Sequence, residues 1–537
     1  MIVNQISQYF YLFWCRYLFS LFYKEQGKVS IDLGVYVNLM HRFILAYLLL
    51  VGLLVISACP AQTVKPLRYR SEMGAYVATL GETPFWLRAN QYGIVPRQVS
   101  FLTIRQAIWM DYRNRSRNKR DSLRTIKQWV DWGWGAEAVY NPGTVRPVLI
   151  PEAYVKVKLK RGFEVWAGKR REIIGLVDSS LTSGSYAWSG NTLPMVKIQL
   201  AVPDYLPRQG LVGFKGFYAH GWFENDRLFN NTMLHQKALY GRFGKSHWRF
   251  KVYGGINHQV MWGGHTDQNL GSVVINKQLP NRFGDYLDVV TASALGNRKN
   301  IDTNRISSFD RENRIGNHLG TVDIGFDYMG RHFSVFAYRQ NIYEDGSLFH
   351  LINLRDGLNG VMIRNRRPIN SHGFQLQKAL FEYLYTEHQG GDLFLEDAAQ
   401  RGRDNYFNHS QYQDGWSRFG STIGTPFISP SNDSRSELPH YVFTNNNRVA
   451  VMHIGLSGQA YNFLRFHLKA SYSENLGTYA IPFEQPVRQF SSILSLSAPI
   501  PHLKGVTTST AIAADIGDLY SRNLGFFIGI RKEGQSR

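Results

Sequence analysis

The chain has 537 residues, of which 44% are hydrophobic and 14% aromatic, with 49 glycines but only 2 cysteines. Its 61 lysines and arginines exceed its 40 acidic residues, which gives a formal net charge of +21. That excess indicates an anionic partner such as lipid headgroups or an acidic polysaccharide, although solubility alone also accounts for it. Neither zinc-type Cys/His spacing nor a nucleic-acid-binding motif accompanies the charge, so we predict no metal, no cofactor and no nucleic-acid partner.

The N-terminal residues have the features of an export leader. The apolar run Ile44–Ala58 is too short for a spanning helix, which needs about 20 residues, and suits a secretory signal peptide. We therefore predict a signal peptide at 40–61 and an over-extended translation start at 1–39. The run ends in a lipobox-like Cys59, so a lipid anchor there stays open as an alternative. The other cysteine, Cys15, also lies in this leader, and no intramolecular disulfide is expected.

The stretch from Trp248 to Gly263, WRFKVYGGINHQVMWG, alternates in character along its whole length. One parity holds Trp248, Phe250, Val252, Ile256, Val260 and Trp262; the other holds Arg249, Lys251, Tyr253, Asn257 and Gln259. Period-2 alternation predicts a strand with one apolar and one polar face. Strands in soluble domains usually stop by about ten residues. This one is long enough to cross a bilayer at a tilt of about 40–45°, with a tryptophan near each interface.

The same alternation recurs along the chain. It is found in the segments AYVKVKLK (153–160), VGFKGFYAHGW (212–222), TVDIGFDY (321–328), FLRFHLKASY (463–472) and LGFFIGIR (524–531). No run after the leader is apolar enough for a membrane helix, and strands satisfy their backbone groups in lipid only by closing into a barrel. We therefore predict an all-β, transmembrane antiparallel β-barrel over residues 62–531, followed by a tail at 532–537.

Connection lengths give a second indication, because outer-membrane barrels combine short periplasmic turns with long external loops. Tight turns are expected at 161–162, 244–246, 330–331 and 460–461, and the longest connections near 263–317 and 388–447. If the strands are numbered from the one near Met73 so that every short turn follows an even-numbered strand, the chain has about eighteen strands and both termini are periplasmic. This numbering requires Asp285–Leu295 to be a helix or loop and His350–Asn365 a strand. A soluble β-sandwich or propeller, the alternative, would have strands of five to eight residues.

Four long segments, 206–224, 234–264, 316–328 and 405–427, resemble the capsule assembly protein Wzi family. The resemblance implies an eighteen-stranded outer-membrane barrel of Gram-negative bacteria with minor helical elements at the periplasmic side or in loops. It implies a lectin-like function, in which the barrel binds exported acidic capsular polysaccharide and attaches it to the cell surface. Its other expected partners are outer-membrane lipid, lipopolysaccharide and further capsule export proteins. The family is not an enzyme family.

Cations on the polar strand faces form one candidate glycan site in the lumen. They include Lys215, Arg249, Lys251, Arg465 and Lys469. Lysine and arginine attract acidic chains and form charge-assisted hydrogen bonds with carboxylates. The alternative is that these cations pair with acids on other strands or on inward-folded loops, for instance Glu396, Asp397 or Asp404.

The connection near 388–447 forms a second candidate. Tyr406, Tyr412 and Trp416 offer flat faces for sugar rings. Asn408, His409 and Arg418 offer hydrogen-bonding groups. The alternative is that the same aromatics form a small core of the loop itself, which would then cap the pore.

Two further classes of function remain as alternatives. A general diffusion porin or passive channel would share the barrel and its polar lumen. A lipase or protease would need a catalytic arrangement, and the adjacent residues Asn408, His409 and Ser410 point to opposite faces of an extended segment. No G-x-S-x-G motif is present, so we predict that the protein is not an enzyme. His258 is expected near the outer interface, in a hydrogen bond.

Overall fold

The computed structural model describes residues 65–98, 101–112, 130–159, 162–296, 298, 300–344, 353–368, 373–393 and 402–536. The chain divides into two units, residues 1–64 and 65–537, and the description below concerns the second. The predicted leader with Cys15 and Cys59 therefore lies outside the described residues, as do Glu396 and Asp397.

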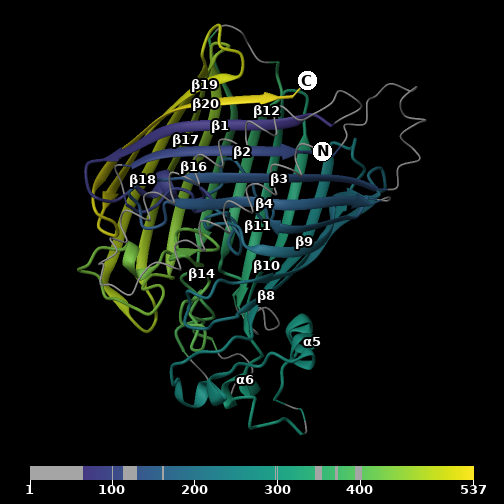
Figure 1. Cartoon of the computed structure of the whole chain (residues 1–537), viewed down its shortest axis with the longest axis vertical. Coiled ribbons are helices and arrows are strands. Elements are labelled where there is room, and N and C mark those ends of the chain that lie inside the picture. The colour runs from purple at the N-terminus through teal and green to yellow at the C-terminus, as the bar shows by residue number, and fades with distance from the viewer. Residues whose placement is uncertain are drawn as a thin grey trace, which may run out of the picture. The chain divides into compact units, whose positions relative to one another are not determined.

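Eighteen strands form one antiparallel sheet that closes on itself, because β1 pairs with both β2 and β20. The strands are β1 (Leu67–Ala78), β2 (Phe101–Met110), β3 (Val130–Tyr140), β4 (Val148–Leu159), β5 (Glu164–Lys169), β6 (Val196–Leu206), β7 (Val212–Trp222), β8 (Met233–Phe243), β9 (Phe250–Trp262), β10 (Asn317–Met329), β11 (Phe333–Glu344), β12 (Gly357–Asn365), β13 (Phe374–Tyr385), β16 (Val449–Ala460), β17 (Leu464–Gly477), β18 (Pro482–Pro499), β19 (Val506–Gly517) and β20 (Asn523–Gln535). Figure 1 shows β1 lying beside β20, where the barrel closes. The predicted antiparallel barrel of eighteen strands is confirmed.

The described residues outside this sheet include few regular elements. They are a small hairpin, β14 (Ser417–Arg418) and β15 (Ser421–Thr422), three helices, α3 (Phe85–Arg88), α5 (Phe283–Thr291) and α6 (Ser308–Glu312), and three single-turn 3₁₀ helices. None of the helices in the described ranges has the length and apolar character needed to cross a bilayer.

Alternation along β9 follows the predicted parity. Phe250 and Val252 point outward and are 55% and 42% exposed, whereas Lys251 points into the barrel and is 6% exposed. The strand is shorter than predicted, because it begins at Phe250 and Trp248 stands in the preceding turn, where its N–H donates to the Lys245 carbonyl at 2.9 Å. A continuous series of outward apolar side chains such as these is typical of a surface that faces lipid.

The two ends of the barrel differ in their connections. Short turns at 207–211, 330–332 and 461–463 lie at the end where β1 begins and β20 finishes, which we call the turn end. Long connections at 79–100, 170–195, 263–316 and 386–448 lie at the opposite end, the loop end. α5 overlaps Asp285–Leu295, where the strand numbering required a helix or loop, and β12 lies within His350–Asn365, where it required a strand. β20 runs to Gln535, so residues 532–535, expected as part of a tail, continue the last strand.

The lumen is filled by the connection between β5 and β6, residues 170–195, which we call the inner loop. The Leu176 N–H donates to Asp323 of β10 at 2.9 Å, and the Tyr186 N–H donates to Gln340 of β11 at 3.0 Å. Farther around the barrel, the Leu181 carbonyl lies 2.8 Å from Nε2 of His453 on β16. The inner loop thus spans the interior from β5 to the far wall.

A buried carboxylate on the barrel wall binds the part of the inner loop that crosses the lumen. Glu382 of β13 has no exposed surface. It accepts hydrogen bonds from the Thr182 hydroxyl at 2.7 Å, from the Ser183 N–H at 2.5 Å and from the Tyr338 hydroxyl. Because a buried charge is tolerated only when its hydrogen bonds are made, this cluster fixes the inner loop in place.

Candidate functional site

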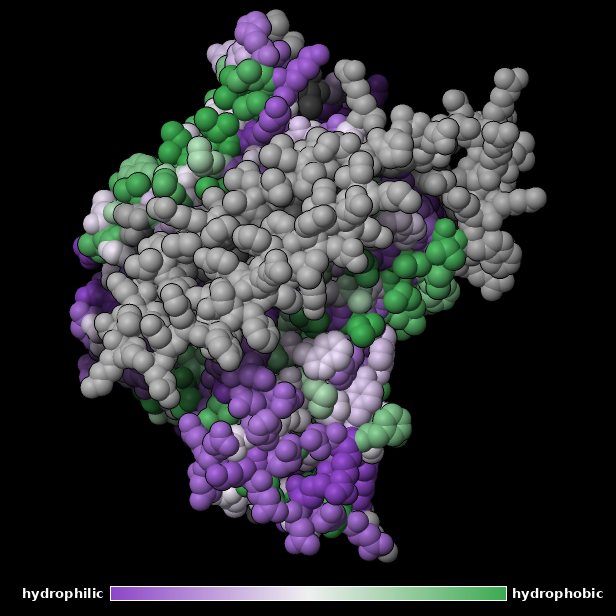
Figure 2. Space-filling view, viewed as in Figure 1, coloured by the Kyte–Doolittle hydropathy of each residue, from purple (hydrophilic) through white to green (hydrophobic). Residues whose placement is uncertain are grey.

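A cavity of about 660 Å³ opens at the loop end. It is lined by the β1–β2 connection, the β3–β4 turn, the end of the inner loop, the β7–β8 connection and the long 386–448 connection, so it is assembled from segments far apart in the sequence. We call it the loop-end cavity. Figure 2 shows hydrophilic side chains gathered over the end of the barrel that carries α5 and α6.

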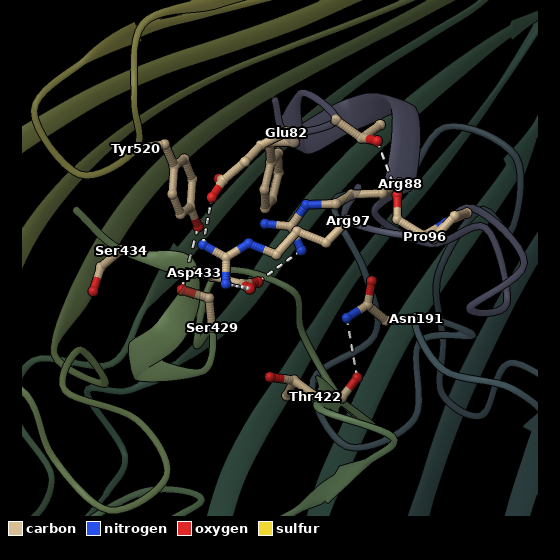
Figure 3. A network of polar contacts seen from close by, with 12 residues as sticks. Glu82, Arg88, Pro96, Arg97, Asn191, Thr422, Ser429, Asp433, Ser434 and Tyr520 are labelled. Atoms are coloured by element: carbon tan, nitrogen blue, oxygen red, sulfur yellow. Dashed lines mark hydrogen bonds and ion pairs between the residues drawn. The ribbon is translucent and has the colours of Figure 1, made fainter. Parts of the chain in front are cut away.

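Two arginines of the β1–β2 connection converge on one carboxylate (Figure 3). Arg88 lies 2.7 Å and Arg97 3.4 Å from the two oxygens of Asp433, which comes from the long connection. Arg97 also lies 2.8 Å from Glu82. Burial is the largest single influence on Arg88 and opposes its charge, but the attraction of Asp433, Tyr520 and Asp515 together raises the pKa of Arg88. The guanidinium group of Arg88 is therefore held cationic at the cavity wall.

Neutral hydrogen bonds join the same segments. The Asn191 side chain of the inner loop donates to the Thr422 carbonyl at 3.0 Å, and the Tyr520 hydroxyl donates to Ser429 at 3.3 Å (Figure 3). These contacts tie the long connection to the inner loop and to the β19–β20 turn. The cavity is consequently preorganised, which reduces the entropy lost when a ligand binds.

An arginine stacked on an aromatic ring forms the exposed part of the cavity. The guanidinium carbon of Arg146 lies 3.8 Å from the ring centre of Phe419, and its Nη2 lies 2.6 Å from Asp226. Phe419 and Gly420 form the turn of the β14–β15 hairpin, and both have positive φ, 51° and 72°. A phenylalanine in this conformation is uncommon and marks a strained position, of a kind that often has a functional use.

The aromatic residues predicted in the long connection are buried. Tyr406, Tyr412 and Trp416 are each at most 2% exposed. The hydroxyl of Tyr406 donates to Asp356 at 2.8 Å, that of Tyr412 to the Gly263 carbonyl at 3.0 Å, and the indole of Trp416 to Asn317 at 3.2 Å. Since protein covers these rings, they cannot stack on a sugar in this conformation, and the geometry favours the alternative of a loop that packs on its own core.

The polar residues predicted in the same connection also bond within the protein. Asn408 exchanges hydrogen bonds with the backbone of Thr444, and Nδ1 of His409 accepts from the N–H groups of Gln411 and Tyr412. Arg418 is 2% exposed and forms an ion pair with Glu224. Of these residues, Arg418 lies in the β14–β15 hairpin, directly beside Phe419.

The cations predicted in the lumen fall into two groups. Lys251 pairs with Asp327 at 2.8 Å, Lys469 donates to the Thr182 carbonyl at 3.0 Å, and Lys215 lies 5.0 Å from the ring of Tyr205. These three contact other lumen residues. Arg249 and Arg465 are exposed beside the turn end, at the opposite end of the barrel from the loop-end cavity.

The sequence prediction missed the residues that line the loop-end cavity, namely Arg88, Arg97, Arg146 and Phe419. They come from three connections that are far apart in the sequence, and no local pattern marks them. Within the described ranges, no group of three or more His, Cys, Asp or Glu side chains could hold a metal ion.

No family model and no curated protein matches the chain. Among solved structures, the chain is similar to Wzi, a carbohydrate-binding β-barrel of the outer membrane that is involved in group 1 capsule assembly in Escherichia coli. The two chains are 12% identical, with a TM-score of 0.52, and the match covers 86% of this chain and 83% of the Wzi chain. Lower similarity is found to OccAB4 of Acinetobacter baumannii (8% identity, TM-score 0.44, coverage 89% and 100%) and OprD of Pseudomonas aeruginosa (7%, 0.44, 90% and 98%). At 12% identity the likeness to Wzi shows a shared fold, which is that of an outer-membrane β-barrel.

Proposed function

We propose that the protein binds an acidic polysaccharide at the loop-end cavity and holds it at the cell surface. In this proposal the loop end faces the outside and the turn end, with both termini of the barrel, faces the periplasm, as is usual for outer-membrane barrels. The expected ligand is an exported, uronate-bearing capsular polysaccharide, and the protein acts as a lectin and not as an enzyme. Lipopolysaccharide and other capsule export proteins are its expected neighbours.

The observation that carries the proposal is the stacked pair of exposed Arg146 and half-buried Phe419, which lines the same cavity as Arg97. An aromatic face packs against the C–H groups of a sugar ring, and a guanidinium group binds a carboxylate through two parallel hydrogen bonds. In the free protein Arg146 contacts Asp226 and Arg97 contacts Glu82, and all four side chains are at least 36% exposed. Exposed ion pairs of this kind contribute little free energy, so a polyanion can replace the protein carboxylates at small cost.

The carbohydrate-binding activity named for Wzi agrees with this proposal, although the similarity extends only to the fold. The alternative function is a general diffusion porin. The inner loop favours the lectin, because its hydrogen bonds to Asp323, Gln340 and Glu382 fill the space that a solute would have to cross.

The test compares two arginines at opposite ends of the barrel. Arg146→Ala should weaken the binding of oligogalacturonate about tenfold, since a charge-assisted hydrogen bond contributes about 1.5–3 kcal/mol. Phe419→Ala should weaken it by a similar factor. Arg249→Ala, which removes the same charge at the turn end, is the matched control and should leave binding unchanged. Binding is measured by calorimetry in detergent, with neutral dextran as the control ligand.

The cellular readout is the fraction of capsular polysaccharide that stays attached to cells. Arg146→Ala should release polysaccharide into the medium, whereas Arg249→Ala should retain it. Each variant must show the heat-modifiable gel mobility of a folded barrel. Unchanged affinity and unchanged retention in folded Arg146→Ala would remove the loop-end cavity from the proposed function.

A further inference from the structure

Several polar residues of β7 to β10 occupy positions whose parity faces lipid. They are His220, His235, Lys237, His258 and His318. Farther toward the turn end, the same outward rows hold exposed apolar side chains such as Phe214, Leu239 and Ile324. Ionisable groups in contact with lipid are costly, so the polar positions need a cover.

The cover is α5, which belongs to the connection 263–316. The hydroxyl of Tyr286 on α5 lies 2.7 Å from the hydroxyl of Tyr218 on the outer face of β7 and 3.4 Å from Nδ1 of His235 on β8. The ammonium group of Lys237 donates to the Val290 carbonyl in the last turn of α5, where the helix dipole favours a cation. α5 therefore packs against the outer wall of the barrel.

An apolar cluster holds this arrangement together. Val260 and Trp262 of β9 pack with Val289 of α5 and with Leu295, Ile306 and Ile315 of the same connection. Below them, Nε2 of His258 lies 2.9 Å from Nδ1 of His318, so the predicted hydrogen bond of His258 is present. α5 and the residues of this apolar cluster thus form a buttress on the outside of the wall, whereas Val273 and α6 of the same connection contact the long 386–448 connection.

The position of Tyr218 shows how far α5 descends. β7 ends at Trp222, and Tyr218 precedes that end by about 13 Å of strand at about 3.3 Å per residue. With the usual tilt of the strands, this depth reaches from the interface into the outer leaflet of the bilayer.

Two apolar side chains of α5 are turned away from the wall, beside Gly284 and Thr291, which are also exposed. Phe283 and Leu287 are one helical turn apart, share a face, and are 77% and 51% exposed. They lie on the same outer side of the barrel as the exposed side chains of Tyr218 and Leu239, because Tyr286 of the same helix reaches the Tyr218 hydroxyl. We propose that this face of α5 is buried among the acyl chains of the outer leaflet, so that α5 anchors the connection 263–316 in the membrane surface. The inference rests on the barrel alone and not on polysaccharide binding.

The test places an environment-sensitive fluorophore at Leu287→Cys, in a chain whose Cys15 and Cys59 are replaced by alanine. The matched control is Val145→Cys, an apolar residue at the loop end that is 81% exposed. Both proteins are reconstituted in vesicles of phosphatidylethanolamine and phosphatidylglycerol. The label at 287 should show blue-shifted emission, lose most of its intensity to doxyl-labelled lipid, and be protected from iodide. The label at 145 should show red-shifted emission, little quenching by doxyl-labelled lipid and strong quenching by iodide.

Two results would overturn the proposal. Equal iodide quenching at 287 and 145, without quenching by doxyl lipid, would place this face of α5 in water. A disulfide-linked dimer of Leu287→Cys in membranes would make the face a contact between copies of the chain. If Leu287→Cys lacks the heat-modifiable mobility of a folded barrel, Phe283→Cys provides a second position on the same face, with the same expected readout.

Discussion

At the scale of single residues, His409 offers a test of how the long connection is held. Its Nδ1 accepts from the N–H groups of Gln411 and Tyr412 at 3.1 and 3.2 Å, and its ring packs edge-on against Phe309 of α6 at 5.4 Å. Burial lowers the pKa of His409 from 6.5 to about 4. The residue is thus held neutral, with its acceptor nitrogen in use.

Acid should therefore loosen this part of the connection. Because the pKa is lower in the folded loop than in the open one, the open loop binds a proton first as the pH falls. The stabilisation by neutral His409 is complete above pH 6.5 and is lost as the pH falls toward 4. The protection of residues 405–416 from hydrogen exchange, relative to the intrinsic exchange rate at each pH, should decrease over that interval. His409→Asn keeps an acceptor but does not titrate, so it should flatten the pH dependence of this protection. If the pH dependence is unchanged in His409→Asn, another group is responsible for it.

The residues of the candidate site show where sequence reasoning reaches its limit. Tyr406, Tyr412 and Trp416 have the composition of a sugar site, but a loop that packs on itself needs the same residue types, and only the fold distinguishes the two. Arg97, Arg146 and Phe419 carry no local pattern. They meet because barrel closure brings the β1–β2, β3–β4 and β13–β16 connections to one end, which is a property of the whole sheet.

At the scale of elements, strands were predictable and loops were not. Alternation has period 2 and is decided by neighbours in sequence, so β9 and β10 could be recognised from their side chains alone. β11 lacks a clear alternation because its outward side carries Arg339 and Asn341, which hydrogen-bond to each other at 3.1 Å instead of presenting an apolar face. The inner loop has no periodicity at all, and its position depends on partners such as Glu382, far away in the chain.

The inner loop also carries a prediction about permeability. Replacing residues 175–189 by a short Gly-Ser linker should raise single-channel conductance in planar bilayers well above that of the intact protein, because the deleted segment makes the bonds that cross the lumen. A deletion within the β3–β4 turn, near Val145, is the control and should leave conductance low. Large currents from the intact protein would favour the porin alternative, and no gain on deletion would mean that other connections close the lumen.

At the scale of the whole molecule, the proposed functions depend on the polarity of the barrel. The connections 79–100, 170–195, 263–316 and 386–448 all lie at one end, and the anchor α5 and the loop-end cavity lie there too. A reversed insertion would therefore put both on the periplasmic side. The sequence indicates this polarity through the lengths of the connections, since outer-membrane barrels have short turns on the periplasmic side and long loops outside.

Labelling of intact cells checks the polarity directly. Val145→Cys stands at the loop end and Leu503→Cys in a turn at the turn end, where Leu503 is 55% exposed. With Cys15 and Cys59 replaced by alanine, a membrane-impermeant maleimide should react with the thiol of Val145→Cys on intact cells and with that of Leu503→Cys only after lysis. The opposite pattern would exclude capture of an exported polysaccharide at the loop-end cavity. It would leave the burial of α5 in lipid standing, but in the inner leaflet, since that burial depends on the wall and not on the direction of insertion.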